Sequence, residues 1–348
     1  MTIHELQVHH LRCITSARFQ FHPRCNLFYG ANGSGKTSLL EAIYVLSSGH
    51  SFRTREISPL VTFDADALTV FARTISDETV SIQKSLSGPT VVKLNGQSCY
   101  NSSELARFLP CQVFYQDIFQ IIDAGPSVRR TLLDWGLFHV EQSYHSLWKN
   151  YRMVLKQRNA LLRQRANRTH FIPWDKQLVE LGHQLDEMRA SYFKKWEALF
   201  HKILPQLTDI PCQISYFKGW DKKGVGKSLE DVLDEQFDSD LQRQFTHSGA
   251  HQADVYFDLS TKKAKLLLSR GQQKIVLIAL KLAQADLVKK ERIYLLDDMA
   301  AELDAEHLHR LIKRLAVVDG QLFVTAMDEK IVQAFDKHVD MKPHLFPY

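Results

Sequence analysis

The sequence predicts an α/β fold whose main unit is assembled from both ends of the chain, with a helical insert between the two parts. Three observations support this prediction. Residues 25–46 combine a short apolar run, a glycine-rich turn and a helical pattern, and residues 292–298 form a second apolar run that ends in two aspartates. Two long stretches with helical periodicity lie between these regions. Strands alternating with helices in this way are typical of parallel sheets.

The composition is that of an ordinary soluble protein. The 348 residues are 45% hydrophobic and 24% charged, enough for one large interrupted domain or two to three small ones. We see neither a signal peptide nor an apolar run of the roughly 18–20 residues that a membrane span needs. Five scattered cysteines without a C-x-x-C pair favour a cytoplasmic protein without a metal cluster. The net charge of +5 permits nucleic-acid binding without demonstrating it.

The first motif is a phosphate-binding loop. Residues 25–46 read CNLFYGANGSGKTSLLEAIYVL and meet the pattern G-x-x-x-x-G-K-[ST] between an apolar strand and a helix. The glycines let backbone N–H groups point at phosphates, and the helix N-terminus adds a favourable dipole. Lys36 would reach the β- and γ-phosphates of ATP as a catalytic group, and Thr37 would hold Mg²⁺. The expected nucleotide-binding residues are Gly30, Ala31, Asn32, Gly33, Ser34, Gly35, Lys36, Thr37 and Ser38.

A similar stretch further on is not expected to bind phosphate. Residues 224–228 read GVGKS, but Asp221 stands where the motif needs glycine and no apolar strand leads directly in. We predict a solvated loop, with Ser228 capping a helix that has acidic residues in its first turn.

The insert contains two helical stretches, at 127–165 and 174–202. In the second, apolar residues recur at alternating steps of four and three, as in a coiled-coil seam. We predict a short antiparallel helical arm, and two ordinary core helices are the alternative. The seam residues are Trp174, Leu178, Leu181, Leu185, Met188, Tyr192 and Leu199.

The insert is also locally basic. From Gln142 to Trp174 there is no acidic residue but there are seven Lys or Arg residues, which would attract DNA phosphates. A solvated helix face is the alternative. No base-reading motif is visible, so we expect recognition that is not sequence-specific. The seven are Lys149, Arg152, Lys156, Arg158, Arg163, Arg165 and Arg168, and the expected DNA contacts are Arg158, Arg163, Arg165 and Arg168.

A second glycine-centred turn lies at a helix start far along the chain. Residues 265–282 read KLLLSRGQQKIVLIALKL, in which Ser269, Arg270, Gly271 and Gln272 begin the helix. Helix N-termini bind anions. Because the first loop already surrounds one side of its own nucleotide, this turn suits the γ-phosphate of a nucleotide held by a second copy. We therefore expect an ATP-dependent homodimer with two composite sites.

The apolar run RIYLLDD at 292–298 should be a buried strand that delivers two carboxylates to its C-terminal end. In open α/β sheets ligands bind at that end. Asp297 would hold Mg²⁺, and Asp298 would orient or deprotonate the attacking water. Asp304 precedes an amphipathic helix, and residues 320–326 look like one more buried strand.

These motifs, in this order, resemble those of ABC-type ATPases. Ser269-Arg270-Gly271-Gln272 is similar to the S-G-G-Q signature, and Asp304 stands in the position of the D-loop. GANGSGKTSLLEAI resembles the chromosome-maintenance and repair branch, and more narrowly the chain looks like the RecF family of recombination mediators. Further matching stretches are GHSFRT (49–54), GPSVRRTLLDWGLFHV (125–140), LKQRNALLRQ (155–164) and HSGAHQADV (247–255).

The resemblance implies an ABC-type head, weak ATP hydrolysis that serves as a switch, ATP-dependent dimerisation and binding of DNA at junctions of single strand and duplex. It also implies a role in recombinational repair, replication restart and the SOS response, together with RecO and RecR, in loading RecA at gaps. By the same resemblance Ser269 and Gly271 would contact the partner's γ-phosphate. Arg53 is a candidate second phosphate contact, and a solvated loop arginine is the alternative.

The sequence departs from transporter ATPases at three places. Asp298 replaces a glutamate, which suits slow hydrolysis, and Thr325-Ala326-Met327 stands where transporters have a histidine. The glutamine loop falls near 114–119, where Gln116 and Asp117 are both candidates. The ATPase subunit of a membrane transporter is the alternative function, but it predicts a shorter insert. A purely structural chromosome clamp would need a longer coiled coil.

We therefore expect three segments. Residues 1–125 form the N-terminal part of the head, 126–204 the helical arm, and 205–348 the C-terminal part of the head.

Overall fold

A parallel sheet built from both ends of the chain lies at the centre of the head, as predicted. The computed structural model describes residues 2–100, 102–259, 262–263 and 268–346. The N-terminal strand β3 pairs with two strands from the C-terminal end of the chain, β13 on one side and β14 on the other, all in parallel. The strand order is β14 (Lys342–Leu345), β3 (Cys25–Tyr29), β13 (Gln321–Ala326), β12 (Ile293–Leu296) and β8 (Cys111–Phe114).

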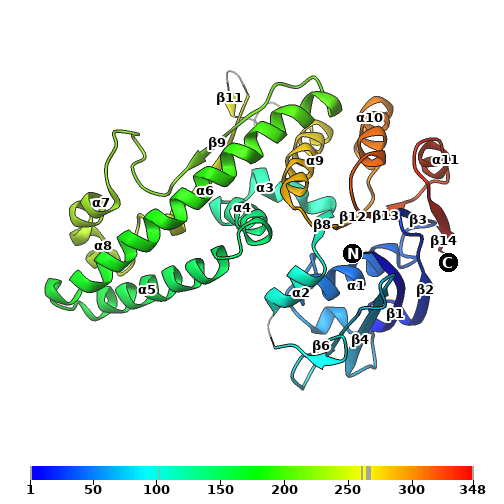
Figure 1. Cartoon of the computed structure of the whole chain (residues 1–348), viewed down its shortest axis with the longest axis horizontal. Helices are drawn as coiled ribbons and strands as arrows, with labels where there is room; N and C mark the ends of the chain where they lie inside the picture. The colour runs from blue at the N-terminus through cyan, green and yellow to red at the C-terminus, as the bar shows by residue number, and fades with distance from the viewer. Residues whose placement is uncertain (1, 101, 260–261, 264–267, 347–348) are drawn as a thin grey trace.

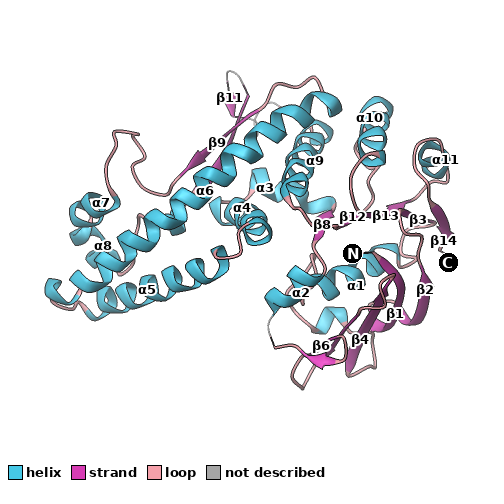
Figure 2. Ribbon diagram, in the orientation of Figure 1, coloured by secondary structure: helices cyan, strands magenta, loops and turns pink. Residues whose placement is uncertain are grey.

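An antiparallel sheet and one helix cover one face of the parallel sheet (Figures 1 and 2). The helix α1 (Lys36–Ser48) packs against strands of both sheets in one apolar cluster. Strand β4 alternates buried and more accessible side chains, as expected when only one face of a sheet is fully covered. The order is β2 (Ile14–Gln20), β1 (Ile3–Leu11), β4 (Ala67–Thr74), β5 (Thr79–Ser85), β6 (Val91–Leu94) and β7 (Gln97–Ser98).

Helices cover the other face of the parallel sheet. The side chains of β12 alternate between the two faces, so Ile293 and Leu295 join the cluster around α1 while Tyr294 and Leu296 join the second core. A four-residue strand that is buried throughout therefore serves both cores. The covering helices are α9 (Arg270–Leu287), α10 (Ala305–Ala316) and α11 (Lys330–Asp336).

A helical arm projects from the head (Figure 1). It is formed by α4 (Pro126–Val140), α5 (Tyr144–Gln164) and α6 (Ile172–Leu207), and all seven predicted seam residues of α6 lie in or against one apolar core. The predicted antiparallel pair of α5 and α6 is confirmed. Helix α6 also packs on α9 in the head and continues past residue 204, so its C-terminal half is a core helix as well.

Later segments complete the arm. A three-stranded antiparallel sheet has the order β11 (Lys262–Lys263), β10 (Asp254–Leu259) and β9 (Gln213–Phe217), and α7 (Leu229–Glu235) and α8 (Phe237–Arg243) contact the arm helices. Ser228 caps α7 as predicted. None of the helices in the described ranges is long and apolar enough to span a membrane. The short helices are α2 (Ser102–Phe108), α3 (Gln120–Asp123), η1 (Ser58–Leu60), η2 (Gln116–Phe119), η3 (Arg168–His170) and η4 (Ala250–Gln252).

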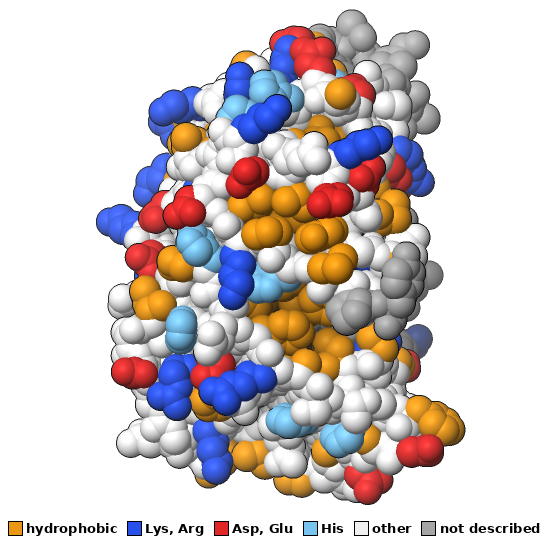
Figure 3. All heavy atoms as spheres, turned by 90° about the vertical axis from the view of Figure 1, so that its right-hand side faces the viewer, with side chains coloured by type: hydrophobic (Ala, Val, Ile, Leu, Met, Phe, Trp, Pro, Cys, Tyr) orange, Lys and Arg blue, Asp and Glu red, His pale blue; other side chains and the backbone are white. Residues whose placement is uncertain are grey.

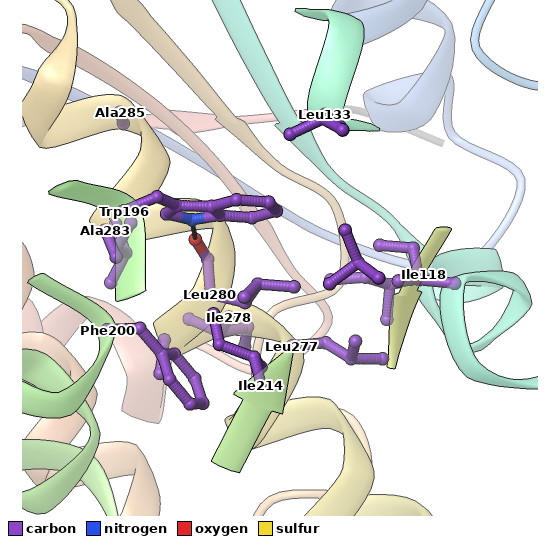
Figure 4. Packing of buried hydrophobic residues seen from close by; sticks show 14 of the residues in the cluster. Ile118, Leu133, Trp196, Phe200, Ile214, Leu277, Ile278, Leu280, Ala283 and Ala285 are labelled. Atoms are coloured by element: carbon purple, nitrogen blue, oxygen red, sulfur yellow. Dashed lines mark hydrogen bonds between the residues drawn. The ribbon is translucent and has the colours of Figure 1, made fainter. Parts of the chain in front are cut away.

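Trp196 joins the arm to the head (Figure 4). This side chain of α6 is fully buried, and its indole N–H donates a hydrogen bond of 2.9 Å to the carbonyl oxygen of Leu280 in α9. Leu133 of α4 and Phe200 of α6 belong to the same core. Arm and head therefore share one continuous apolar core, which favours their moving together.

The structure corrects the prediction for Arg158. Its side chain is completely buried, and its guanidinium donates to Asp175 and Asp240 at 2.7 Å each and to Thr246 at 2.8 Å. A buried charge is tolerated only when it is paired, and here the pairing holds α5, α6 and α8 together. The prediction that Arg158 contacts DNA is wrong, because no part of it reaches the surface.

Replacing Arg158 should therefore destabilise the fold. We expect Arg158→Met to lower the free energy of unfolding by about 3–5 kcal/mol, because it removes the arginine that pairs with the buried carboxylate of Asp240 and leaves only the contacts of His247. Arg163→Met, in the same helix but exposed, is the matched control and should change stability little. Urea titration monitored by circular dichroism measures both. Equal stability of the two variants would contradict a structural role for Arg158.

Candidate nucleotide site

The phosphate-binding loop connects β3 to α1 and needs glycine for two reasons. Gly35 precedes the first helical residue with a φ of 103°, and Gly30 has a φ of 145°, both outside the range that other residues prefer. A Cβ on Gly30 would also lie 2.7 Å from the carbonyl oxygen of Phe346. The C-terminal segment thus packs directly on the loop.

Lys36 folds back over this loop. Its ammonium group donates to the carbonyl oxygens of Gly30 at 2.7 Å and Ala31 at 2.6 Å, and approaches the hydroxyl of Ser34 at 3.4 Å. Burial lowers the pKa of Lys36, while the nearby carboxylates of Asp298 and Asp297 raise it. The charge is thus held at the centre of the loop.

Asp297 follows β12 and contacts residues of α1 and β13. Its Oδ1 accepts hydrogen bonds of 2.9 Å from the hydroxyls of Thr37, at the start of α1, and Thr325, at the end of β13. Burial raises the pKa of Asp297, and the two threonine hydroxyls act in the opposite direction. A threonine hydroxyl beside a carboxylate is a suitable donor set for Mg²⁺, which commonly takes only one or two protein ligands.

Asp298 has a left-handed backbone conformation, with a φ of 45°. Its N–H donates a 2.8 Å hydrogen bond to the hydroxyl of Thr325, so one threonine holds both aspartates. Lys274 of α9 donates to the carbonyl oxygens of Ala301 at 2.6 Å and Asp298 at 3.3 Å. The turn that follows β12 is thereby fastened to β13 and to α9.

One cavity of about 420 Å³ unites the two motifs. Arg53 also lines it, as the sequence led us to consider. The loop that carries Arg53 is anchored by Ser51, whose hydroxyl donates to the buried Glu41 and accepts the N–H of Arg53 at 2.9 Å. The lining residues are Cys13, Asn32, Gly33, Gly35, Lys36, Thr37, Ser38, Arg53, Asp297, Asp298, Thr325, Ala326 and Met327.

The second glycine-centred turn lies outside this cavity. Ser269 caps α9 and forms a reciprocal capping box with Gln272, and Arg270 pairs with Asp123 at 3.1 Å. A Cβ on Gly271 would lie 2.3 Å from the carbonyl oxygen of Glu302, so glycine is required by close packing on the segment that follows β12. Ser269 and Arg270 are exposed, and no residue of the turn lines the cavity in the described structure.

The remaining predicted residues are spread over the molecule. Asp304 caps α10 through the N–H of His307. Arg163, Arg165 and Arg168 are exposed at or just after the end of α5. Helix α5 lies in the arm, away from strands β3 and β12 of the head (Figure 1). The glutamine-loop candidates Gln116 and Asp117 fall within η2, but their side chains lie outside the described residues, as do residues 264–267 before the second turn.

Sequence reasoning missed three contributors. Thr325 was noted only as a replacement for histidine, although a polar residue at the end of a buried strand is itself a signal of a site. Lys274 follows the second turn directly, and no pattern indicated its contacts. Cys13 approaches Ser38 at 3.6 Å from a strand connection that carries no motif.

The head face opposite the arm is rich in hydrophobic side chains, which gather across its middle in Figure 3. Strands β2 and β14 contribute a hollow of about 440 Å³ on the head, lined by Phe19, Leu345 and Phe346 among others. Phe346 also touches the phosphate-binding loop, and Leu345 is 66% exposed. Apolar surface therefore adjoins the nucleotide cavity.

Comparison with known proteins identifies the family. The sequence profile described as RecF/RecN/SMC N terminal domain matches residues 2–344. The DNA replication and repair protein RecF of Cellvibrio japonicus is 38% identical over 344 residues, covering 96% of this chain and 93% of that protein. RecF of Shewanella piezotolerans is 39% identical over 336 residues, covering 94% and 92%.

Comparison with solved structures agrees with these sequence comparisons. A structure of the recombination mediator protein RecF with ATP, in the RecFOR pathway, superposes with a TM-score of 0.83 at 26% identity, covering 94% of this chain and 92% of that one. An SMC head bound to the C-terminal winged-helix domain of ScpA has a TM-score of 0.60 at 16% identity, covering 98% and 92%, and shows a shared fold. The fold is thus the predicted ABC-type ATPase head with a helical insert, and the chain belongs to the RecF family.

Proposed function

We propose that the chain is an ATP-switched DNA-binding protein of recombinational repair and replication restart. The observation that carries the proposal is the single cavity in which the phosphate-binding loop meets Asp297 and Asp298. Relatives named DNA replication and repair protein, and a similar structure described with ATP, support it. Membership of this family disfavours the transporter alternative.

ATP would bind with its phosphates on the loop N–H groups and the N-terminus of α1. Lys36 would exchange the carbonyl oxygens of Gly30 and Ala31 for phosphate oxygens. Thr37 and Asp297 would hold Mg²⁺, whose contribution is to neutralise charge on the phosphates. The 2.9 Å hydrogen bond between these two side chains supports this assignment.

Hydrolysis would depend on Asp298 and a second copy. Asp298 lines the cavity and would accept a proton from, or orient, the attacking water. Its side chain is shorter than glutamate, which fits weak hydrolysis used as a reset. The working state is then the ATP-bound dimer, and turnover returns it to monomers.

The second copy would supply the exposed turn at Ser269–Gln272. Its backbone N–H groups and the Ser269 hydroxyl suit a γ-phosphate presented from outside the chain. Two exposed apolar side chains beside the cavity, Met327 and Leu345, would be covered by such a partner. Exposed apolar surface next to a ligand cavity is typical of a contact site.

DNA would lie along the arm and be bound through the attraction between basic side chains and its phosphates. The helix α5 exposes Lys149, Arg152, Lys156 and Arg163, and none of these has an ion pair among the described residues. Arg165 adds a fifth charge at the helix end, whereas Arg168 already pairs with Asp234 at 2.8 Å. Such a surface contacts phosphates and does not distinguish bases. We include RecR and RecO as partners, and RecA loading at gaps as the outcome, on the basis of the family alone.

Mutation of the exposed turn tests the dimer. Ser269→Arg should leave ATP binding intact and abolish the ATP-dependent increase in mass, because the arginine would meet the partner's nucleotide. Ser228→Arg is the matched control, since it removes a comparable helix cap elsewhere. Light scattering with and without ATP gives the answer. Dimerisation of the Ser269→Arg variant would show that the turn does not contact the partner's nucleotide.

The metal dependence should vary with pH. Because burial raises the pKa of Asp297, its carboxyl remains protonated to a higher pH than the ordinary 3.8. The gain in ATP affinity on adding Mg²⁺ should therefore begin to fall at a higher pH than an ordinary aspartate would cause, because a protonated carboxyl does not bind the metal. Calorimetric titration at several pH values measures this gain, and Asp297→Asn should remove it. A gain that is the same in Asp297→Asn as in the unchanged chain would refute this role.

Neutralising the arm should flatten the salt dependence of DNA binding. Changing Arg152, Lys156 and Arg163 to Gln should reduce the slope of log K against log salt by up to about 3, with each lost phosphate contact contributing about 0.9. Changing Lys194, Lys195 and Lys202 of α6 to Gln alters net charge equally and should leave the slope unchanged. Fluorescence anisotropy with a gapped duplex separates the two triple variants, and identical slopes would place the DNA elsewhere.

A further inference from the structure

A second cavity lies between the head and the base of the arm. It has a volume of about 500 Å³, is open to solvent on one side, and is lined by the loop at 50–55, the edge strand β8, helices α3 and α4, and helix α9. The ATP site described above does not use it, although Arg53 lines both cavities. A volume of this size suits a small organic molecule.

The walls of this cavity are largely aromatic and aliphatic. Tyr44, Phe52 and Tyr115 form a connected cluster, with ring centres 5.5 Å and 5.3 Å apart along the series. Trp135 and Leu132 of α4 line the cavity as well. Such walls favour a ligand with an apolar or aromatic body.

The charged groups among the described residues that line it all carry the same sign. The ammonium of Lys281 enters from α9, and Arg53 and Arg55 are exposed on the loop. No carboxylate is among its described lining residues. Lys281 is 7% exposed and donates only to the carbonyl oxygen of Val113, so its charge has no anionic partner there. Burial lowers its pKa to about 8, and burial raises the pKa of the neighbouring Cys111 thiol to about 12, which keeps that thiol neutral.

A buried hydrogen-bond donor in the lining is also unsatisfied. The side-chain Nε2 of Gln112, on β8, has no hydrogen-bond partner among the described residues, and Gln112 is 3% exposed. An unpaired buried amide is destabilising, so a ligand that accepts its hydrogen bond is favoured. A carboxylate would satisfy both groups, because it supplies an anion for the Lys281 ammonium and a hydrogen-bond acceptor for the Gln112 amide.

We propose that this cavity is a binding site for a small carboxylate with an aromatic or aliphatic body. The carboxylate pairs with Lys281 and accepts the Gln112 N–H once that side chain turns toward the cavity, and the body packs on Tyr44, Phe52 and Trp135. The positive charge of the described lining disfavours a cation, and the apolar walls disfavour inorganic phosphate.

Arg53 makes this site a neighbour of the nucleotide cavity. Its backbone N–H is held by Ser51, which lines the second cavity. A ligand that moves this loop changes ATP affinity, and ATP then changes the affinity of the ligand by the same factor. This coupling rests on the proposed ATP site, whereas binding of the carboxylate does not. A chain that binds the probe but not ATP would therefore contradict the proposed function and still support the assignment of this cavity.

The test uses 4-phenylbutyrate as the probe and its neutral analogue 4-phenylbutan-1-ol as the matched control. Ligand-observed NMR titration of the full chain should show saturable binding of the acid, with the alcohol at least tenfold weaker. Equal affinity of the two, or no binding of the acid, would overturn the proposal. Excess ATP should not compete fully with the acid, since full competition would place the probe in the nucleotide cavity.

Two variants locate the site. Lys281→Met, which keeps the length of the side chain, should weaken binding of the acid at least tenfold and leave the alcohol unchanged. Thr131→Trp fills the cavity from an exposed position of α4 and is expected to preserve the fold. It should remove binding of both compounds, even if Lys281→Met does not fold. Unchanged binding to Thr131→Trp would show that the probe binds elsewhere.

Discussion

The pairing of β3 between β13 and β14 is the constraint on which the rest of the structure depends. It brings the first thirty residues against the last thirty, and the register sets which residues meet. Leu296 pairs with Val324, so the next residues along the two strands, Asp297 and Thr325, emerge at the same edge. A slip of one residue would turn each side chain to the opposite face and separate the aspartate from both threonines.

Helix α9 transmits the position of this sheet edge to the rest of the molecule. At its first turn Arg270 contacts Asp123, one turn later Lys274 holds the segment after β12, and further along Lys281 and Gln284 donate to the carbonyl oxygens of Val113 and Leu132. Trp196 then binds the same helix to the arm. These contacts reach both cavities and the exposed turn, so a shift of α9 would move residues at all three places.

The strongly patterned parts of the molecule could be predicted from the sequence. The loop at 30–38 and the strand at 292–298 are local signals, and strand polarity alone placed them at one sheet edge. Arg158 shows the limit of such reasoning. Its basic neighbourhood indicated a DNA contact, but its partner Asp240 lies on another helix, and nothing local distinguishes a paired arginine from a free one. Gly271 was interpreted through phosphate contact alone, whereas its packing against Glu302 is visible only in three dimensions.

The geometry also explains why binding and turnover would be separate events. Lys36, Thr37 and Asp297 belong to one chain and already touch the loop or one another, so a single copy has the groups needed to bind a nucleotide. The turn at Ser269 does not line that cavity in the described structure. In the proposed dimer a second copy would supply this turn to the γ-phosphate side. A ligand shifts an equilibrium only by its differential affinity for the two states. In the proposed dimer that difference comes from the contacts of Ser269 and Gly271, and the nucleotide is thereby an assembly signal before it is a substrate.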